Sequence, residues 1–261
     1  MYNFQLIQSL LRNYEAAVVD RRISPNDSMN DQWYFEVGRS AVEVIAVALM
    51  ASKIQAVNKV LDVPCGHGRV LRHLIHLFSG AEFHACDLDT DGVDFCASTF
   101  GAIPIYSQEE LTDVDFGSQY DLIWAGSLFT HTTQDVTRRW TAYLARFLSP
   151  QGIIVATSHG RWCQHVHKVA PYIGEDRWQE ILKDYSSLGY GYRDYLKKES
   201  HQFISGSYGI SIAKPHVTIR NLEDIPGIRI YLYLERGLAD HQDVVAFGRP
   251  SYDEPWPNMH K

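Results

Sequence analysis

The 261-residue sequence is short of cysteine, of long apolar runs and of basic charge. Its four cysteines show no CxxC spacing, which argues against zinc and disulfide frameworks and predicts free thiols. The longest apolar run, residues 44–51, is too short to cross a bilayer. The net charge of −7 comes with no basic stripe for phosphate contacts. We therefore expect a small-molecule partner, no nucleic-acid binding and no membrane insertion.

The first residues also lack the pattern of a secretion signal, because no basic region is followed by an apolar stretch and a small-residue cleavage site. We therefore expect a cytoplasmic protein. The composition, 45% apolar and 21% charged, is typical of a globular enzyme. A single domain of this size buries roughly 70–75% of the surface of its extended chain, so the fold needs neither disulfides nor structural metals.

Short apolar segments alternate with segments of helical periodicity through the centre of the chain. Strands are predicted at 60–63, 81–86, 102–106, 120–125 and 153–157. Helices are predicted at 70–78, 91–99 and 133–148. This alternation predicts an α/β fold with a doubly wound, mostly parallel sheet that binds ligands beyond the carboxyl ends of its strands. Two further strands, 228–234 and 244–247, are joined by a short connection at 235–243 and favour an antiparallel end of the sheet.

A glycine-containing turn, residues 62–69, joins the first predicted strand to its helix. Glycines let the backbone approach a ligand at a helix N-terminus. Leu71 stands where a dinucleotide site prefers a small residue, and the Asp62 carboxylate would repel a phosphate but attract an ammonium group. Asp87 follows Gly68 at about the 20-residue offset at which a carboxylate binds ribose hydroxyls. The pattern predicts a nucleoside ligand with a cationic tail, with capping or turn formation as the alternative role of both aspartates.

Three segments resemble motifs of the class I (Rossmann-like) S-adenosylmethionine-dependent methyltransferases. Residues 60–68 look like the first motif, 85–89 like the second and 120–127 like the fourth. The resemblance implies a seven-stranded sheet with an antiparallel last strand and S-adenosyl-L-methionine as the cofactor. It also implies that residues 107–110 border the adenine.

The resemblance places a cofactor site at the ends of the first strands. Gly66 and Gly68 would line the methionine and ribose portion, and Asp87 would bind the ribose. Arg39 would pair with a carboxylate of the cofactor or of the substrate, with a surface ion pair as the alternative. The full set of expected cofactor-binding residues is Asp62, Pro64, Cys65, Gly66, His67, Gly68, Asp87, Leu88, Gln108, Ser127 and Arg39.

Three histidines follow predicted strand ends, namely His131, His159 and His241. An imidazole that titrates near pH 6.5 can take a proton from a nucleophile, so each is a candidate catalytic base, with a loop or packing role as the alternative. His131 is favoured because it follows the segment that leaves the fourth strand. The resemblance implies that the substrate meets the methyl group at this segment. The three histidines lie on separate loops without the close spacing of helix-borne metal ligands, so no metal is expected. The acidic magnesium cluster of catechol-type family members has no counterpart at 125–127.

The segment 160–208 is rich in aromatic residues, and we expect a helical cap that stacks on a flat substrate and shields the reaction from water. Its nine aromatic residues are Trp162, Tyr172, Trp178, Tyr185, Tyr190, Tyr192, Tyr195, Phe203 and Tyr208. The chain is then a single methyltransferase-like domain, 1–261. Its expected parts are an N-terminal helical cover (1–56), a cofactor-binding core (57–159), the cap insert (160–208), the C-terminal part of the sheet (209–250) and a tail (251–261).

The sequence therefore predicts an S-adenosylmethionine-dependent methyltransferase acting on a small molecule, such as a glycosyl, lipid-linked or secondary-metabolite acceptor, with O-methylation as the expected reaction. Two alternatives use the same pocket. One is an enzyme that cyclises part of the cofactor and releases methylthioadenosine, and the other is a non-catalytic nucleoside-binding scaffold. A nicotinamide oxidoreductase is disfavoured by Asp62 and Leu71.

Overall fold

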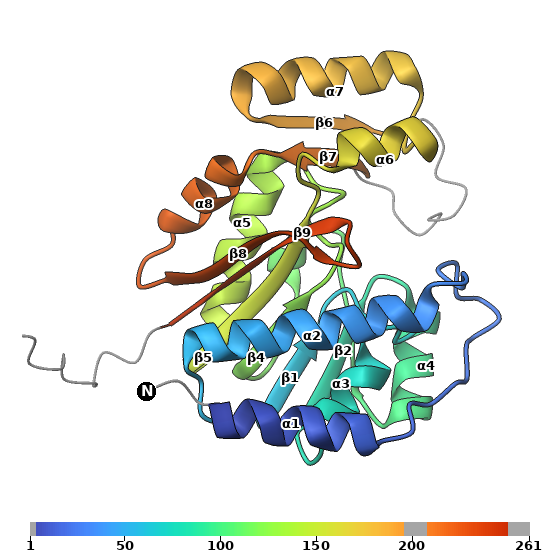
Figure 1. Cartoon of the computed structure of the whole chain (residues 1–261), viewed down its shortest axis with the longest axis vertical. Helices are drawn as coiled ribbons and strands as arrows, with labels where there is room; N and C mark the ends of the chain where they lie inside the picture. The colour runs from blue at the N-terminus through green and yellow to red at the C-terminus, as the bar shows by residue number, and fades with distance from the viewer. Residues whose placement is uncertain (1–3, 196–207, 250–261) are drawn as a thin grey trace, which may run out of the picture.

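The computed structural model describes residues 4–195 and 208–249, and Figure 1 shows a central sheet with a smaller cap above it. The sheet has seven strands in the order β3-β2-β1-β4-β5-β9-β8. Their bounds are β1 (Lys59–Asp62), β2 (Glu82–Asp87), β3 (Ile103–Tyr106), β4 (Tyr120–Ala125), β5 (Leu148–Ser158), β8 (Arg229–Leu238) and β9 (Gln242–Gly248). All neighbouring strands are parallel except β9, which runs antiparallel to both β5 and β8. The predicted fold class is confirmed.

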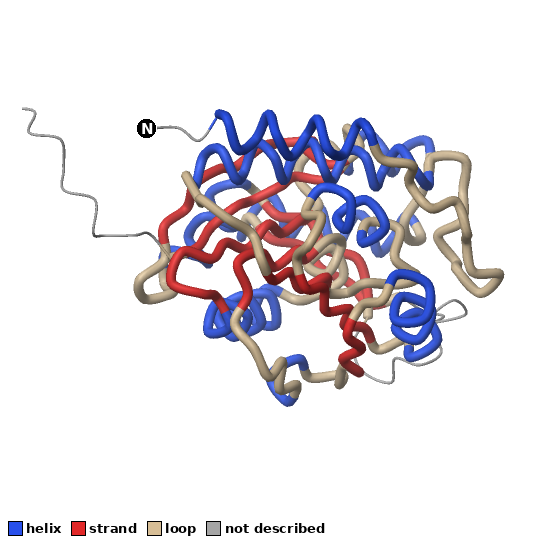
Figure 2. The backbone as a smooth tube through the Cα atoms, turned by 90° about the horizontal axis from the view of Figure 1, so that it is seen from below, coloured by secondary structure: helices blue, strands red, loops and turns tan. Residues whose placement is uncertain are grey.

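Helices cover both faces of this sheet, as the view from below shows (Figure 2). One face carries α1 (Phe4–Ala16), α2 (Tyr34–Ser52), α3 (Leu71–Leu77) and α4 (Thr90–Phe100). The other carries α5 (Gln134–Leu144), α8 (Pro215–Glu223) and the 3-10 turns η1 (Leu111–Asp113) and η2 (Ala145–Phe147). Val60 and Leu122 enter the first core, while the adjacent Leu61 and Ile123 enter the second. Because both faces are buried, the strands read as nearly continuous apolar runs.

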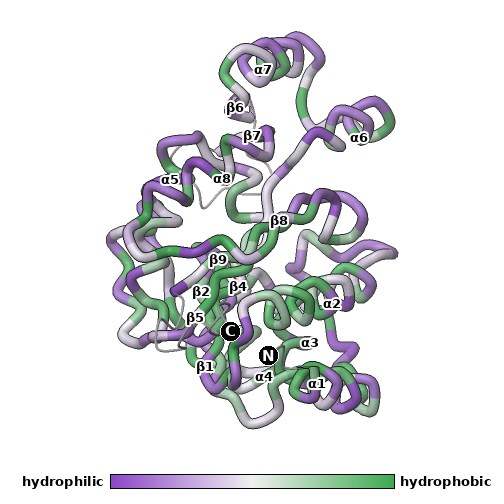
Figure 3. The backbone as a smooth tube through the Cα atoms, turned by 60° about the vertical axis from the view of Figure 1, so that its left-hand side comes forward, coloured by the Kyte–Doolittle hydropathy of each residue, from purple (hydrophilic) through white to green (hydrophobic). Residues whose placement is uncertain are grey.

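Hydropathy follows this layering, and Figure 3 shows α2 as largely hydrophobic and the outer helix α7 (Glu175–Leu188) as largely hydrophilic. Among the described residues, no helix combines the length and the apolar character that a membrane crossing requires. Phe203 of the aromatic segment and the tail at 251–261 lie outside the described residues.

The cap contains a small sheet as well as helices, which differs from the helical cap that the sequence predicted. Its elements are α6 (Cys163–Val169), α7, β6 (Tyr190–Asp194) and β7 (Gly209–Ala213). β7 pairs antiparallel with β6, so residues 209–213 belong to the cap and not to the main sheet. Tyr190 and Tyr192 are two residues apart in β6, and Ile210 and Ile212 are two residues apart in β7. This spacing is the period of two that strands require, so both segments form strands and not the helices expected for the aromatic segment.

The connection between β8 and β9 is a tight turn, shorter than the predicted one. Ala239 and Asp240 have φ values of 53° and 54°, and the His241 N–H donates to the Leu238 carbonyl over 2.9 Å. Two successive positive φ values are the mark of a type I′ hairpin turn. The turn places His241 beside the carboxyl end of β5, with which β9 pairs.

A buried arginine joins the N-terminal segment to the glycine turn. The side chain of Arg72 is fully buried. Its Nε donates to the Gly68 carbonyl over 3.0 Å and its Nη2 to the His67 carbonyl over 3.2 Å. Its Nη1 donates to the carbonyls of Asp20 and Arg22, over 3.1 and 2.5 Å. A single guanidinium therefore binds two segments that are far apart in sequence.

Aromatic rings and a phenol complete the surroundings of this guanidinium. Nη2 of Arg72 also donates to the Tyr34 hydroxyl over 3.0 Å, and that hydroxyl donates to the Asp27 carboxylate over 2.6 Å. The guanidinium carbon lies 5.0 Å from the ring centre of Tyr34 and 5.1 Å from that of Phe100. The chain at 20–34 is thereby fixed over the turn that follows β1.

We predict that Arg72→Leu lowers the free energy of unfolding by about 3 kcal/mol or more, because it removes the hydrogen bonds and ring contacts of a fully buried guanidinium that joins two segments of the chain. Urea denaturation measures this difference. Arg138→Leu is the matched control, since Arg138 is half-exposed and pairs only with the exposed Asp224 in the described residues, so its loss should cost at most about 1 kcal/mol. Equal destabilisation by the two variants would contradict the role assigned to Arg72.

Candidate functional site

The turn after β1 brings its backbone close to the end of β2. Gly66 and Gly68 have φ values of 48° and 74°, in the left-handed region that favours glycine. The Gly66 N–H donates to the Asp87 carboxylate over 2.7 Å, and the Cys65 N–H donates to the Cys86 carbonyl over 2.9 Å. The structure thus brings together the glycines and the acidic strand end that the sequence singled out.

Gly92, a residue that sequence reasoning missed, allows α4 to approach this turn. A Cβ atom at Gly92 would lie 2.6 Å from the carbonyl oxygen of Gly66, so only glycine fits. The neighbouring Asp91 carboxylate lies 2.8 Å from His67 Nε2, which ties α4 to the turn a second time. A glycine in the first turn of a helix carries no local signal of this contact, because the contact depends on the packing of α4 against the turn.

Asp62 ends β1 as a buried carboxylate with an unused acceptor. Its side chain is 1% exposed, and within the described part of the chain its Oδ2 atom has no hydrogen-bond partner. Burial, followed by the negative charge of Asp87, raises the pKa of Asp62 well above its usual range. A cation bound beside Oδ2 would relieve both effects. This unpaired oxygen fits the ammonium group of S-adenosylmethionine.

Asp87 ends β2 next to Asp62 and already accepts two backbone hydrogen bonds. The donors are the N–H groups of Gly66 and Asp89, at 2.7 and 3.0 Å. Burial raises the pKa of Asp87, and the backbone donors partly offset that rise. A carboxylate has about four acceptor positions, so this one can still accept from ribose hydroxyls.

Cys65 is a packing residue in this turn. Its thiol lies against Cys96 of α4, and both thiols approach the Gly66 carbonyl, at 3.3 and 3.5 Å. The contact with Cys96 and burial raise the pKa of Cys65, which keeps the thiol neutral. All four cysteines are free and buried, in agreement with the sequence prediction.

Ser127, which follows β4, is fixed by a network that the sequence did not reveal. Its φ is 61°, and its N–H donates to Thr157 Oγ1 over 2.7 Å. Thr157 in turn donates to Gln242 Oε1 over 2.6 Å, and Gln242 Nε2 donates to Ser127 Oγ over 3.1 Å. The three residues come from the loops or ends of β4, β5 and β9, so only the strand order brings them together.

The remaining expected cofactor residues are Pro64, Leu88, Gln108 and Arg39. Pro64 lies within the turn after a cis peptide bond, and Leu88 directly follows Asp87. Gln108 is exposed just beyond β3, which pairs with β2. The Arg39 side chain is 68% exposed and pairs with Glu43 one helical turn later on α2. The sequence left two roles open for Arg39, and one of them, the surface ion pair, is present in the structure.

The three predicted histidines meet at the carboxyl edge of the sheet. The ring centres of His131 and His159 are 6.5 Å apart, and those of His159 and His241 are 5.4 Å apart. His131 Nδ1 lies 2.8 Å from the Gly209 carbonyl, which can only accept, so Nδ1 carries the proton of the neutral ring. Burial, followed by the charges of His131 and His241, lowers the pKa of His159 well below its usual range.

Tyrosines of the cap close over these histidines. The Tyr208 ring centre is 4.7 Å from that of His131, and the Tyr195 ring centre is 6.1 Å away. Burial, followed by Tyr195 and by the negative charge of Asp87, raises the pKa of Tyr208. Tyr208 therefore lies against His131 and within electrostatic range of Asp87 at the end of β2.

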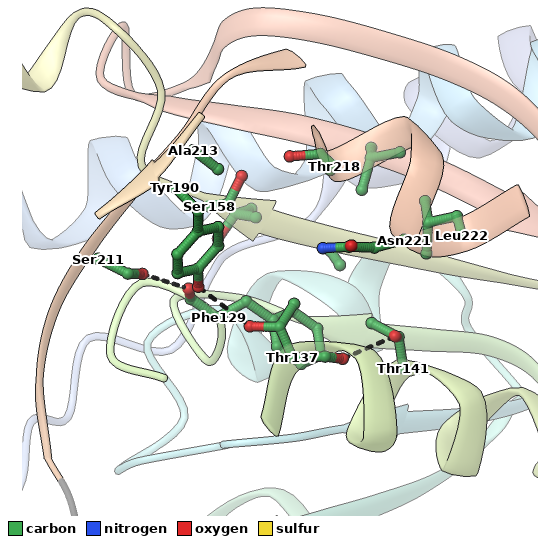
Figure 4. A pocket seen from close by; sticks show the side chains of 13 residues that line it. Phe129, Thr137, Thr141, Ser158, Tyr190, Ser211, Ala213, Thr218, Asn221 and Leu222 are labelled. Atoms are coloured by element: carbon green, nitrogen blue, oxygen red, sulfur yellow. Dashed lines mark hydrogen bonds between the residues drawn. The ribbon is translucent and has the colours of Figure 1, made fainter. Parts of the chain in front are cut away.

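A separate cavity of about 30 Å³ lies between α5, α8 and the cap sheet (Figure 4). Thr137 and Tyr190 face each other across it with their hydroxyl oxygens 3.2 Å apart, and Asn221 approaches from α8. This volume holds one or two water molecules and is far too small for a nucleoside. The cavity is therefore distinct from the candidate cofactor site.

Comparison with known proteins supports the assignment that the sequence resemblance predicted. Residues 61–154 match a family model described as a methyltransferase domain. No curated protein sequence matches the chain. The matched region contains the glycine turn, Asp62, Asp87 and Ser127.

Solved structures share the fold at low sequence identity. PH0226 from Pyrococcus horikoshii OT3 has 14% identity and a TM-score of 0.56, covering 87% of this chain and 97% of that chain. A S-adenosylmethionine-dependent methyltransferase from Clostridium acetobutylicum ATCC 824 has 10% identity and a TM-score of 0.53, covering 86% and 94%. DhpI in complex with SAM and HEP has 17% identity and a TM-score of 0.52, covering 96% and 100%. The chain has a class I methyltransferase fold, and this fold and the matched domain together support an S-adenosylmethionine-dependent methyltransferase.

We predict that Gly92→Ala weakens the binding of S-adenosylhomocysteine at least tenfold, because the added methyl group displaces the Gly66 carbonyl and with it the turn. Isothermal titration calorimetry gives the affinity. Gly174→Ala is the matched control, since a Cβ atom there meets no other atom within 4 Å and the φ of −57° suits any residue. A Gly92→Ala protein that binds as tightly as this control would show that α4 does not shape the site.

We also predict that the affinity for S-adenosylmethionine falls as the solution is acidified. The raised pKa of Asp62 means that its carboxyl group protonates above about pH 4, where exposed aspartates titrate, and the protonated form no longer attracts an ammonium group. Titrations between neutral pH and pH 5 measure this loss. Asp62→Asn should bind weakly at every pH and show a flatter pH profile. An unchanged profile in Asp62→Asn would assign the pH dependence to another group.

Proposed function

We propose that this enzyme methylates a hydroxyl group of a small-molecule acceptor held between the cap and the carboxyl ends of the main sheet. The observation that carries the proposal is the meeting of His131 and cap tyrosines beside the acidic end of β2. A group that can accept a proton and aromatic side chains thus lie near the candidate cofactor site. Glycosyl, lipid-linked and secondary-metabolite acceptors all present hydroxyl groups of the required kind.

The cofactor half of the proposal rests on two carboxylates with different tasks. Asp62 would hold the cationic ammonium group through its unpaired oxygen, and Asp87 would accept from the ribose hydroxyls. The left-handed turn at Gly66 and Gly68 joins β1 to α3 beside these two carboxylates, and the partly exposed Gly66 would face the ligand. The cofactor, when bound, supplies a methyl group on a positively charged sulfur. Alignment and exclusion of water then account for most of the rate.

His131 is the proposed catalytic base. Its Nδ1–H donates to the Gly209 carbonyl, so Nε2 carries the lone pair that takes the proton of the acceptor hydroxyl. The hydrogen bond also fixes the ring in one orientation. His159 is less suited to this role, because its buried ring donates from Nδ1 to the Ser211 carbonyl and its low pKa makes it a weak base.

The first experiment incubates the purified protein with S-adenosylmethionine and a panel of hydroxylated glycosides, lipid-linked sugars and aromatic metabolites. Mass spectrometry follows both cofactor-derived products. We expect S-adenosylhomocysteine together with an acceptor heavier by one methylene group. Release of methylthioadenosine would instead identify cofactor cyclisation. Tight cofactor binding with neither product, across a broad panel, would favour the scaffold.

We predict that His131→Gln lowers kcat by roughly 10²–10⁴-fold and leaves the affinity for S-adenosylhomocysteine within about twofold, because a base acts on the acceptor and not on the cofactor. Steady-state kinetics and calorimetry give the two numbers. His165→Gln is the matched control, since His165 is an exposed histidine of α6. A kcat for His131→Gln equal to that of the control would remove His131 from the reaction.

A further inference from the structure

Three metal-ligand side chains meet where the cap joins the sheet. His159 follows β5, Cys163 begins α6 and His241 occupies the β8–β9 turn. Their possible ligand atoms all lie within 4.8 Å of one another, and no other group of three or more His, Cys, Asp or Glu side chains in residues 4–195 and 208–249 does so. His159 is 4% exposed and Cys163 1%, and His241 is partly buried, so this is not a chance gathering of surface groups.

The donor set and its dimensions suit zinc. One thiolate sulfur and two imidazole nitrogens are ligands that Zn²⁺ prefers. In a tetrahedral site with Zn–S near 2.3 Å and Zn–N near 2.0–2.1 Å, sulfur and nitrogen lie about 3.5 Å apart. The observed separation between Cys163 Sγ and His241 Nε2 is 3.8 Å. Small rotations of the side chains would bring this pair to the distance that zinc requires.

The orientation of His159 matches that of a metal-bound histidine. Its Nδ1 lies 3.2 Å from the Ser211 carbonyl, which can only accept, so Nδ1 carries the hydrogen. Nε2, on the other side of the ring, is then the nitrogen with the lone pair. Histidines that bind metals commonly donate their second N–H to a backbone carbonyl in this way, which fixes both the tautomer and the ring plane.

The cluster joins two parts of the molecule. His159 and His241 belong to the edge of the main sheet, whereas Cys163 belongs to the cap. The cap residue Tyr172 also reaches this junction: its hydroxyl is hydrogen-bonded to His241 Nε2 over 2.5 Å, a bond that an ion on this nitrogen would replace, and its ring centre lies 5.1 Å from that of His159. An ion bound here would cross-link cap and sheet, as structural zinc ions do in small domains.

We propose that His159, Cys163 and His241 form a zinc site that fastens the cap to the carboxyl edge of the sheet. The separation of the histidines along the chain argued against a metal, but that spacing rule applies to ligands on one helix. Here the type I′ turn and the end of β5 bring the two histidines together, and the third ligand is Cys163, to which no sequence pattern pointed. The proposal does not depend on which acceptor is methylated.

Metal analysis of the full-length chain tests this site directly. The protein is purified without a histidine tag, stripped with a chelator, incubated with Zn²⁺ and dialysed. We expect about one zinc per chain by elemental analysis and a lower Tm after chelation. With Co²⁺ in place of Zn²⁺, a thiolate-to-cobalt charge-transfer band should appear in the near ultraviolet, since the proposed ligands include Cys163.

Two variants and one control separate the site from adventitious binding. Cys163→Ser and His241→Gln should each weaken zinc binding about 100-fold or more, and Cys163→Ser should abolish the charge-transfer band. Circular dichroism of the metal-free proteins shows whether each variant folds. If Cys163→Ser fails to fold, His241→Gln still tests the site. His165→Gln, which alters an exposed histidine nearby, should bind zinc as the unaltered chain does. No zinc in the unaltered chain, or equal binding by all four proteins, would overturn the proposal.

Discussion

The buried guanidinium of Arg72 is the constraint on which the cofactor side of the molecule depends. An arginine deprived of water is costly unless its donors are paired, and here carbonyls from the glycine turn and from the N-terminal segment accept most of them. Asp27 balances the charge from a distance through the Tyr34 hydroxyl. The turn after β1 can hold its left-handed glycines because the segment above it is fixed, so the N-terminal cover is part of the site and not an appendage.

Two buried carboxylates, those of Asp62 and Asp87, lie at the ends of neighbouring strands. Their mutual repulsion and their burial oppose the folded state, and the backbone donors at Gly66 and Asp89 relieve only Asp87. A cationic ligand bound beside Asp62 would offset the electrostatic cost of burying this carboxylate. Local destabilisation that a ligand relieves is a common property of functional sites, and it gives a physical reason for a buried carboxylate at the end of β1.

The features that the sequence predicted are those encoded locally. β4 begins and ends where the apolar run 120–125 predicted, and the glycine turn and the acid after β2 follow from residue type and offset. Gly92 and Gln242 act through contacts that form only after the strands are ordered, so no pattern around them pointed to the site. The Ala239–Asp240 turn lacks the glycine or asparagine that usually marks a type I′ turn, and the predicted connection was accordingly too long.

The cap determines the positions of the catalytic candidates as much as the main sheet does. The β7 N–H groups of Ser211 and Ala213 donate to the carbonyls of Thr130 and His159, each over 2.9 Å, while the Gly209 carbonyl fixes the His131 ring. The loops after β4 and β5 therefore gain their order by pairing with a cap strand. A cap attached in this way is not a lid hinged at a distance, because moving it would break the hydrogen bonds that aim the histidines. Substrate entry is thus expected to leave β7 in place and to involve other segments of the protein.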